Sequence, residues 1–326
     1  MTHPVAGDAA APTRAPILDR RAMGPVLLFA ALALVPLAAR LGTESFVLSL
    51  MTRVVVLALA AMALDLLVGH ARLVSFGHAA FLGIGAYAVA IPAAEGSTDL
   101  LVQLPLAVGA AALFALVTGL IALRTSGVYF IMITLAFGQM AYFLATSLSG
   151  YGGDDGSTLP GRTTVLGRDL LRGDAAFYWV CLACLVGTYI LGRRLVASRF
   201  GRVLVGTGEN PTRMEAIGFE PFRYQLAAYV LSGAATGLAG FLLANQAGFV
   251  SPATMAWQRS GDLIFMVILG GLGSLHGAVL GAVAFLLAEE VLAHFTVHWR
   301  IVFGPLLILV VLFARGGLTG LLEGRR

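Results

Sequence analysis

The chain has 326 residues, of which 59% are hydrophobic and only 12% are charged. Soluble domains carry about 25% charged residues, so this composition excludes an ordinary soluble domain and indicates an integral membrane protein. The net charge of +4 comes from 21 basic residues, all of them arginine, against 17 acidic ones. Because the cytoplasmic loops of membrane proteins concentrate basic residues, this charge does not indicate nucleic-acid binding.

Residues 1–22 are rich in alanine and proline and lack a signal-peptide cleavage pattern, so we expect a disordered cytoplasmic tail. A transmembrane domain is expected over residues 23–314, followed by a C-terminal cytoplasmic tail at 315–326. Since a helical crossing needs about 20 apolar residues, the apolar runs predict an all-α polytopic fold with about ten transmembrane helices. The runs occupy residues 23–41, 46–68, 73–93, 101–123, 127–148, 176–192, 224–247, 262–275, 277–293 and 301–314. The eighth and tenth runs are short, which indicates broken or tilted helices.

The distribution of arginines orients these helices. Ten crossings place both termini on the same side of the membrane. If that side is the cytoplasm, the inner segments hold 14 arginines and the outer segments hold six, while Arg53 lies within a span. This asymmetry favours an N-in, C-in topology. Six of the inner arginines lie in residues 193–223, which we call the basic segment.

Small and polar side chains interrupt the apolar sequence around the second and third runs. Ionisable groups within a membrane are costly and often functional, so one interpretation of this segment is a translocation path. The candidate path residues are Asp65, Ser75, Gly77, His78 and Gly83. Asp65 also lies close enough to the membrane surface to pair with Arg72. Close helix packing through small residues, with one hydrogen-bonded histidine, explains the same sequence equally well.

Motifs of catalysis are absent from the sequence. No G-x-x-x-x-G-K-[ST] loop occurs, and neither H-E-x-x-H nor G-x-S-x-G is present. Cys181 and Cys184 form a C-x-x-C motif, but they lie in an apolar run, where thiols behave as small hydrophobic side chains. The histidines are scattered and lack the further ligands of a zinc site. The sequence favours transport over catalysis, and no metal or cofactor is expected.

The basic segment carries the signals of one very short helix. Asn210 suits an N-cap, and Pro211 suits the first helical position. Gly218 can adopt the left-handed conformation that closes a helix. Met214 and Ile217 would form the apolar face of these two turns. Such a helix suits docking to a soluble cytoplasmic partner, whereas a solvated loop explains the arginines but not the caps.

Six blocks follow one another along the chain. They are L-D-L-L-V-G-H-A-R-L-V-S-F-G-H-A-A-F-L-G-I-G-A-Y (64–87), R-T-S-G-V-Y-F-I-M-I-T-L-A-F-G (124–138), G-G-D-D-G-S-T-L-P-G (152–161), S-R-F-G-R-V-L-V-G-T-G-E-N-P-T-R-M-E-A-I-G (198–218), G-F-V-S-P (248–252) and G-G-L-G-S-L-H-G-A-V-L-G-A (270–282). In their order and spacing they resemble the membrane subunits of ABC importers for branched-chain amino acids, particularly the LivM-type permeases. The resemblance extends from about residue 64 to residue 292.

The resemblance implies a division of labour among several chains in the lipid of a bacterial inner membrane. A periplasmic substrate-binding protein would deliver the solute, this chain and a second permease subunit of the LivH type would form the path, and ABC ATPase subunits would drive it. The implied ATPase-coupling residues are Glu209, Asn210, Pro211, Arg213, Met214, Glu215, Ala216, Ile217 and Gly218. In the outer loop at 149–175, Gly153, Asp154 and Asp155 would face the binding protein. A solvated acidic turn is an equally good interpretation of that loop.

Several positions depart from the family pattern. Asp65 stands where the family commonly has an amide and Arg72 where a small residue is usual, so the two are expected to compensate as a pair. A G-T-G sequence precedes Glu209 where a helical, more basic run is common, so the docking helix is expected to start later or to bind less tightly. His276 stands where an aromatic residue is frequent. These departures leave urea, another amino acid or an aromatic acid open as the substrate.

Two other classes of protein remain open. A self-contained secondary transporter also has about ten spans and glycine-rich broken helices, but it would be expected to carry central carboxylates or an ion site. A passive channel would need a ring of selectivity groups. The short capped helix at 209–218 discriminates between these classes and favours the ABC permease.

Overall fold

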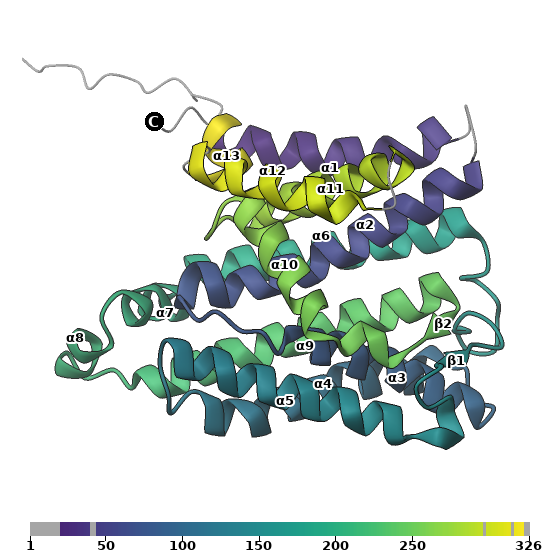
Figure 1. Cartoon of the computed structure of the whole chain (residues 1–326), viewed down its shortest axis with the longest axis horizontal. Helices are drawn as coiled ribbons and strands as arrows, with labels where there is room; N and C mark the ends of the chain where they lie inside the picture. The colour runs from purple at the N-terminus through teal and green to yellow at the C-terminus, as the bar shows by residue number, and fades with distance from the viewer. Residues whose placement is uncertain (1–19, 40–43, 296–297, 314–315, 323–326) are drawn as a thin grey trace, which may run out of the picture.

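The computed structural model describes residues 20–39, 44–295, 298–313 and 316–322 (Figure 1). The helices and strands, in chain order, are α1 (Arg20–Ala39), α2 (Glu44–Asp65), a π-helical turn (Leu66–Ala71), α3 (His78–Ala94), α4 (Leu100–Ala122), α5 (Val128–Ser147), the 3-10 turn η2 (Ser149–Tyr151), β1 (Ser157–Thr158), α6 (Asp174–Ala197), α7 (Arg199–Glu209), α8 (Pro211–Ala216), α9 (Pro221–Ala247), β2 (Phe249–Val250), the 3-10 turn η3 (Pro252–Met255), α10 (Trp257–Gly270), α11 (Leu275–Phe295), α12 (Trp299–Phe313) and α13 (Gly317–Leu322).

Six helical stretches in the described residues are long and apolar enough to cross a membrane. They are Ser45–Ala71, Leu100–Ala122, Val128–Ser147, Asp174–Ala197, Pro221–Ala247 and Leu275–Phe295. The helices α1, α3, α10 and α12 fall in the other four predicted runs and are shorter or less apolar. α1 begins at Arg20, inside the segment expected to be a tail, and α13 forms within the expected C-terminal tail. The rest of both predicted tails lies outside the described residues.

Helix α2 lies in the core of the bundle. It contacts α1, α6, α9, α10 and α11, and every residue from Val54 to Leu64 is buried. Many of these residues are alanine or valine, whose short side chains let neighbouring helices approach closely. In lipid, where apolar burial alone does not hold helices together, such close packing supplies the dispersion energy that does.

The molecule has two distinct ends, which we name after the secondary-structure elements found there. The α8 end carries α7, α8 and α13, whereas the strand end carries η2, β1 and β2 (Figure 1). At the strand end, β1 pairs antiparallel with β2, so Ser157 lies opposite Val250. At the α8 end, the hydroxyl of Thr319 in α13 donates to the carbonyl of Gly270, the last residue of α10, at 2.9 Å.

Helices α3 and α10 both begin inside the bundle. After the π-helical turn, the chain runs back into the molecule before α3 starts, so the predicted run at 73–93 becomes helical only at His78 (Figure 1). The chain likewise returns from β2 through η3 before α10 begins at Trp257. The first turns of the two helices meet, because the amide of Ala79 donates to Ser260 Oγ at 3.0 Å. From this meeting point α3 runs to the strand end and α10 to the α8 end.

Glycines let these helices pack backbone against backbone. A Cβ on Gly85 of α3 would overlap the carbonyl of Gly237 in α9, and one on Gly240 would overlap the carbonyl of Leu82. Between α10 and α11, Gly281 leaves room for the carbonyl of Met266 in the same way. Close packing therefore accounts for these glycines.

Candidate functional site

The basic segment forms two helices, α7 and α8, that project from the bundle at one end (Figure 1). The predicted caps of α8 are confirmed. Asn210 Oδ1 accepts from the amide of Arg213 at 2.9 Å, Pro211 occupies the first helical position, and Gly218 has a φ of +92°. The amide of Phe219 then donates to the carbonyl of Met214 at 3.0 Å, which closes the helix.

The apolar face of α8 divides in two. Met214 is buried against α7. A Cβ built on Gly206 of α7 would lie 2.8 Å from the Met214 Sδ, so Met214 packs α8 onto α7. Ile217 is 62% exposed and Phe219 is 37% exposed. The prediction that Met214 and Ile217 both face a partner is therefore wrong for Met214, and Ile217 with Phe219 forms the exposed apolar surface. The other residues from Pro211 to Gly218 are also exposed.

Helix α7 connects α8 to the bundle. It includes the G-T-G sequence and extends to Glu209, so these glycines are helical, and the docking helix α8 begins at Pro211 after the Asn210 cap. Near its end, Gly208 packs on the π-helical turn, because a Cβ there would lie 2.9 Å from the carbonyl oxygen of His70 and 3.0 Å from that of Ala71. Next to this contact, Arg72 adopts a left-handed φ of 55°, which is uncommon for a residue with a side chain. α7 and this turn therefore pack with no side chain between them at position 208.

The predicted pair between Asp65 and Arg72 does not form. Asp65 is fully buried, and its Oδ1 accepts from the amide of Gly273 at 2.8 Å. Arg72 points instead toward Glu209, with 4.0 Å between the guanidinium and the carboxylate, and both side chains are exposed. The cause is the π-helical turn between Asp65 and Arg72, which turns the two side chains to different neighbours. Asp65 thus joins α2 to the turn between α10 and α11.

The other predicted path residues are also buried. Ser75 and His78 are 0% exposed, and Ser75 Oγ accepts from the amide of Gly77 at 3.3 Å. His78 Nε2 lies 2.8 Å from Ser232 Oγ. The Ser232 hydroxyl donates to the carbonyl of Ala63, so Nε2 must be the donor to Ser232. These bonds tie the start of α3 to α9 and α2, while the buried hydrogen bond from Ala79 to Ser260 closes the α3–α10 junction.

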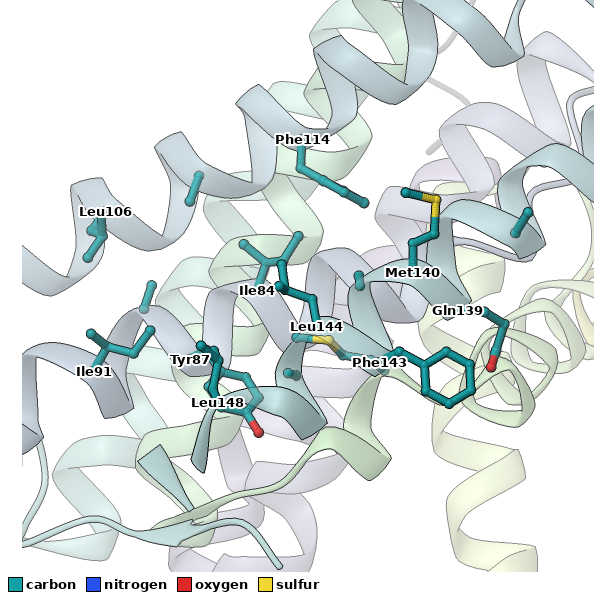
Figure 2. Close-up of a pocket in the computed structure, with 16 residues that line it drawn as sticks. Ile84, Tyr87, Ile91, Leu106, Phe114, Gln139, Met140, Phe143, Leu144 and Leu148 are labelled. Carbon is teal, nitrogen blue, oxygen red and sulfur yellow. The ribbon is translucent and has the colours of Figure 1, made fainter. Parts of the chain in front are cut away.

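A large cavity lies between α3, α4 and α5 (Figure 2). Its volume is about 940 Å³, within the range of small-molecule sites. The lining residues are Ile84, Tyr87, Ala88, Ile91, Leu106, Ala110, Phe114, Ala136, Gln139, Met140, Ala141, Phe143, Leu144, Ala145, Leu148 and Met255. None of these described residues carries a charge. The Tyr87 hydroxyl is buried and has no hydrogen-bond partner among the described residues, a state that costs free energy in the folded protein.

The cavity could not be predicted from the sequence, because its walls are formed by apolar residues of the kind found throughout membrane-spanning helices. The two polar groups in its lining, Tyr87 and Gln139, were the available signal, since both interrupt apolar runs. Gly83, one of the predicted path residues, lies directly behind the cavity wall and contacts Met255. Asp65, Ser75, Gly77 and His78 are not among the lining residues.

The outer loop is fixed at three points. β1 pairs with β2, and Tyr151 donates to Glu95 Oε1 at 3.1 Å, which raises the pKa of the tyrosine hydroxyl. Thr163 is buried, where its hydroxyl donates to Gln103 Oε1 at 2.6 Å and its amide to Asn245 Oδ1 at 2.8 Å. The amide side chains of Gln103 and Asn245, unusual in apolar runs, were the sequence signal for this anchor.

Between these anchors, the loop exposes the predicted contact residues. Gly152, Gly153 and Gly156 have φ values between +51° and +96°, which glycine adopts without steric cost. They turn the chain tightly, so that Asp154 and Asp155 are exposed at the tip. Within the described ranges, no group of three or more His, Cys, Asp or Glu residues is placed to hold a metal ion.

The bundle of long apolar helices, the two helices that begin inside it and the exposed α8 define an integral, multi-pass membrane protein of the permease type. Residues 46–311 match the family described as the branched-chain amino acid transport system permease component. The chain belongs to this family.

Two relatives are named as high-affinity branched-chain amino acid transport system permease protein LivM. The chain is 29% identical to the protein from Salmonella typhimurium over 280 residues and 27% identical to that from Escherichia coli K12 over 278 residues. Each alignment covers 78% of this chain and 65% of the relative. A third relative, the autoinducer 2 import system permease protein LsrC of Escherichia coli DH10B, is 27% identical over 198 residues, covering 59% of this chain and 57% of that protein. No solved structure matches the chain.

Proposed function

We propose that this chain is the membrane-spanning permease subunit of an ABC importer that moves branched-chain or related amino acids into a bacterial cell. Family membership and the names of the LivM relatives support the substrate class. The name of LsrC, whose transported molecule is not an amino acid, keeps other small solutes as the alternative. Separate ATPase subunits hydrolyse ATP.

The observation that carries this proposal is the geometry of α8. A six-residue helix with complete caps is held away from the bundle on α7, and it presents Ile217 to solvent. Capping residues stabilise such a short helix by about 1 kcal/mol, so it keeps its shape without a core of its own. A preformed amphipathic helix of this kind suits a hydrophobic groove on a partner protein. We assign that partner as the ATPase subunit.

The contacts below α8 supply a route for coupling. Met214 fixes α8 on α7, and Gly208 fixes α7 on the π-helical turn. From there, Asp65 holds the turn between α10 and α11. α10 begins at the junction with α3, so movement of α8 reaches the point where both interrupted helices meet. Opening of this junction would give alternating access.

The same arrangement sets the proposed topology. With α8 in the cytoplasm, α13 lies on the cytoplasmic side and the outer loop lies in the periplasm, which agrees with the arginine distribution. Asp154 and Asp155 would then face a substrate-binding protein, and a LivH-type chain would complete the path. In this proposal the chain lies in the bacterial inner membrane.

The test is co-purification of ATPase activity. The chain, extracted gently from its native membrane, is expected to bring vanadate-sensitive ATP hydrolysis with it. Ile217→Asp should abolish this association and uptake, because a charge would enter an apolar groove. Thr212→Asp, at an exposed position in the first turn of the same helix, serves as the charge control. If several mild detergents yield folded protein with no ATPase, or if Ile217→Asp transports normally, α8 is not the coupling helix.

A further inference from the structure

Met255 forms part of the cavity wall and rests on a glycine. It ends the turn η3, is 4% exposed and lines the cavity. A Cβ built on Gly83 of α3 would lie 2.7 Å from Met255 Cε and 3.1 Å from its Sδ. The absence of a side chain at position 83 therefore lets Met255 lie against α3 instead of extending into the cavity. Together, the two residues set the cavity's extent toward η3.

The cavity lies in the half of the molecule nearer the strand end. Its lining residues on α5 run from Ala136 to Leu148, which follows the last helical residue. At a rise of 1.5 Å per residue, this wall is about 18 Å long. On α3 the lining residues lie near the end of the helix that points toward the strands. A solute that enters from the strand end meets this cavity before it reaches the closed α3–α10 junction.

The chemistry of the lining restricts what can enter. The walls are apolar and uncharged, so burying an ammonium or carboxylate group there would be costly. An apolar side chain fits, while the charged groups of an amino acid stay outside the cavity. A lipid acyl chain would also fit by polarity, so measurements of uptake must distinguish these two occupants.

We propose that the cavity receives the apolar side chain of the transported amino acid, and that Met255, seated on Gly83, limits the size of that side chain. This inference rests on the proposed function. It assigns to the permease a size filter in addition to the selection made by the binding protein. Adding or removing one methylene in an apolar pocket changes discrimination by about 10–200-fold, so a single methionine can carry such a filter.

The test compares uptake of alanine, valine, leucine and phenylalanine in cells that hold the complete transporter. All strains share the same binding protein, so a change in the ratio between two solutes must come from this chain. Met255→Phe narrows the cavity, Met255→Ala widens it, and Gly83→Ala pushes Met255 off α3. Gly187→Ala, where an added Cβ meets nothing within 4 Å, is the matched control. Membrane levels of each variant are measured in parallel.

Gly83→Ala and Met255→Phe are expected to lower the phenylalanine-to-valine uptake ratio by about 10-fold. Met255→Ala should raise the ratio, and Gly187→Ala should leave it unchanged. If Met255→Phe, Met255→Ala and Gly83→Ala all keep the wild-type ratio within about twofold, the filter does not exist, which is also the result expected of a lipid-filled cavity. If the wild-type cells import none of the four amino acids, the proposed substrate class fails and this inference fails with it.

Discussion

At the scale of single residues, one buried carboxylate joins two distant parts of the chain. Asp65 ends α2, and its Oδ1 accepts from the amide of Gly273, 208 residues away. The backbones approach so closely here that a Cβ on Gly69 would overlap the Gly273 amide. The hydrogen bond is partly buried, because Asp65 is fully buried whereas Gly273 is exposed. Losing a hydrogen bond of this kind costs about 1–3 kcal/mol.

This geometry predicts different effects for two substitutions of Asp65. Asp65→Asn retains an acceptor oxygen and should change the free energy of unfolding by less than about 1 kcal/mol. Asp65→Leu has similar size but no acceptor, so it should destabilise the protein by about 1–3 kcal/mol. Unfolding of the purified variants in the same detergent measures both. Equal losses for the two variants would mean that the hydrogen bond to Gly273 contributes nothing.

The cavity supplies a second prediction at this scale. The Tyr87 hydroxyl is buried without a partner, so Tyr87→Phe removes a desolvated polar group and leaves the ring in place. The variant should be more stable than the wild type by about 1 kcal/mol, which a thermal unfolding midpoint in detergent would detect. A lower midpoint would indicate that the hydroxyl has a partner in the resting protein, such as a bound water.

At the scale of secondary-structure elements, α7 and the π-helical turn form the connection between α8 and the bundle. π-helical turns are rare and occur frequently at functional sites. This one follows the buried end of α2 and precedes Arg72, whose left-handed conformation redirects the chain into the bundle. α7 packs directly on it through Gly208. Under the proposed function, a small displacement of α7 would shift the segment that leads into α3.

Gly208→Ala should uncouple ATP hydrolysis from transport. Alanine favours the helix by about 1 kcal/mol over glycine, so a loss of function must come from the added Cβ, which would push α7 off the His70 carbonyl. Uptake should fall at least about 10-fold while ATPase subunits still co-purify, because α8 itself is unchanged. Gly109→Ala, whose added Cβ meets nothing within 4 Å, should behave as wild type. Normal uptake by Gly208→Ala would exclude this contact from the coupling route.

At the scale of the whole molecule, the two ends differ in chemistry. The α8 end bears the arginines of the basic segment, whereas the strand end presents the acidic pair at Asp154 and Asp155. Basic residues are retained on the cytoplasmic side of bacterial membranes. The proposed ATPase contact and the proposed binding-protein contact therefore lie at opposite ends of the fold (Figure 1), which the proposed topology puts on opposite sides of the membrane.

Labelling of single introduced cysteines should show on which side of the membrane each end of the molecule lies. In a protein whose Cys181 and Cys184 are replaced by serine, Asp155→Cys should react with a membrane-impermeant maleimide added outside the inner membrane. Glu215→Cys should react only after that membrane is opened. Both positions are exposed, so the reagent can reach them in the folded protein. Labelling of both from the same side would overturn the topology.

Much of the helical content and the form of α8 could be predicted from the sequence, because both depend on neighbouring residues. Apolar runs mark helices, and the caps at Asn210, Pro211 and Gly218 act within two turns. The family resemblance rested on ordered blocks and is confirmed by the match over residues 46–311. The topology and the roles assigned to individual site residues stay predictions.

Other features depended on contacts between segments far apart in the chain. The late start of α3 follows from Thr134 and Ser260, whose side chains accept from Phe76 and Ala79 inside the bundle. No local pattern shows that these groups meet. For the same reason, the expected pair of Asp65 with Arg72 was wrong, since Gly273 supplies the partner of Asp65.

The sequence by itself thus determined the membrane class, the approximate helices and the capped α8, since hydrophobic length and capping are local properties. Only the tertiary structure decided which groups lie together: the closed junction of α3 and α10, the contact of Gly208 with the π-helical turn and the cavity beside Met255. Each of these depends on the close approach of backbones that small residues permit, and such packing is set by the whole bundle at once.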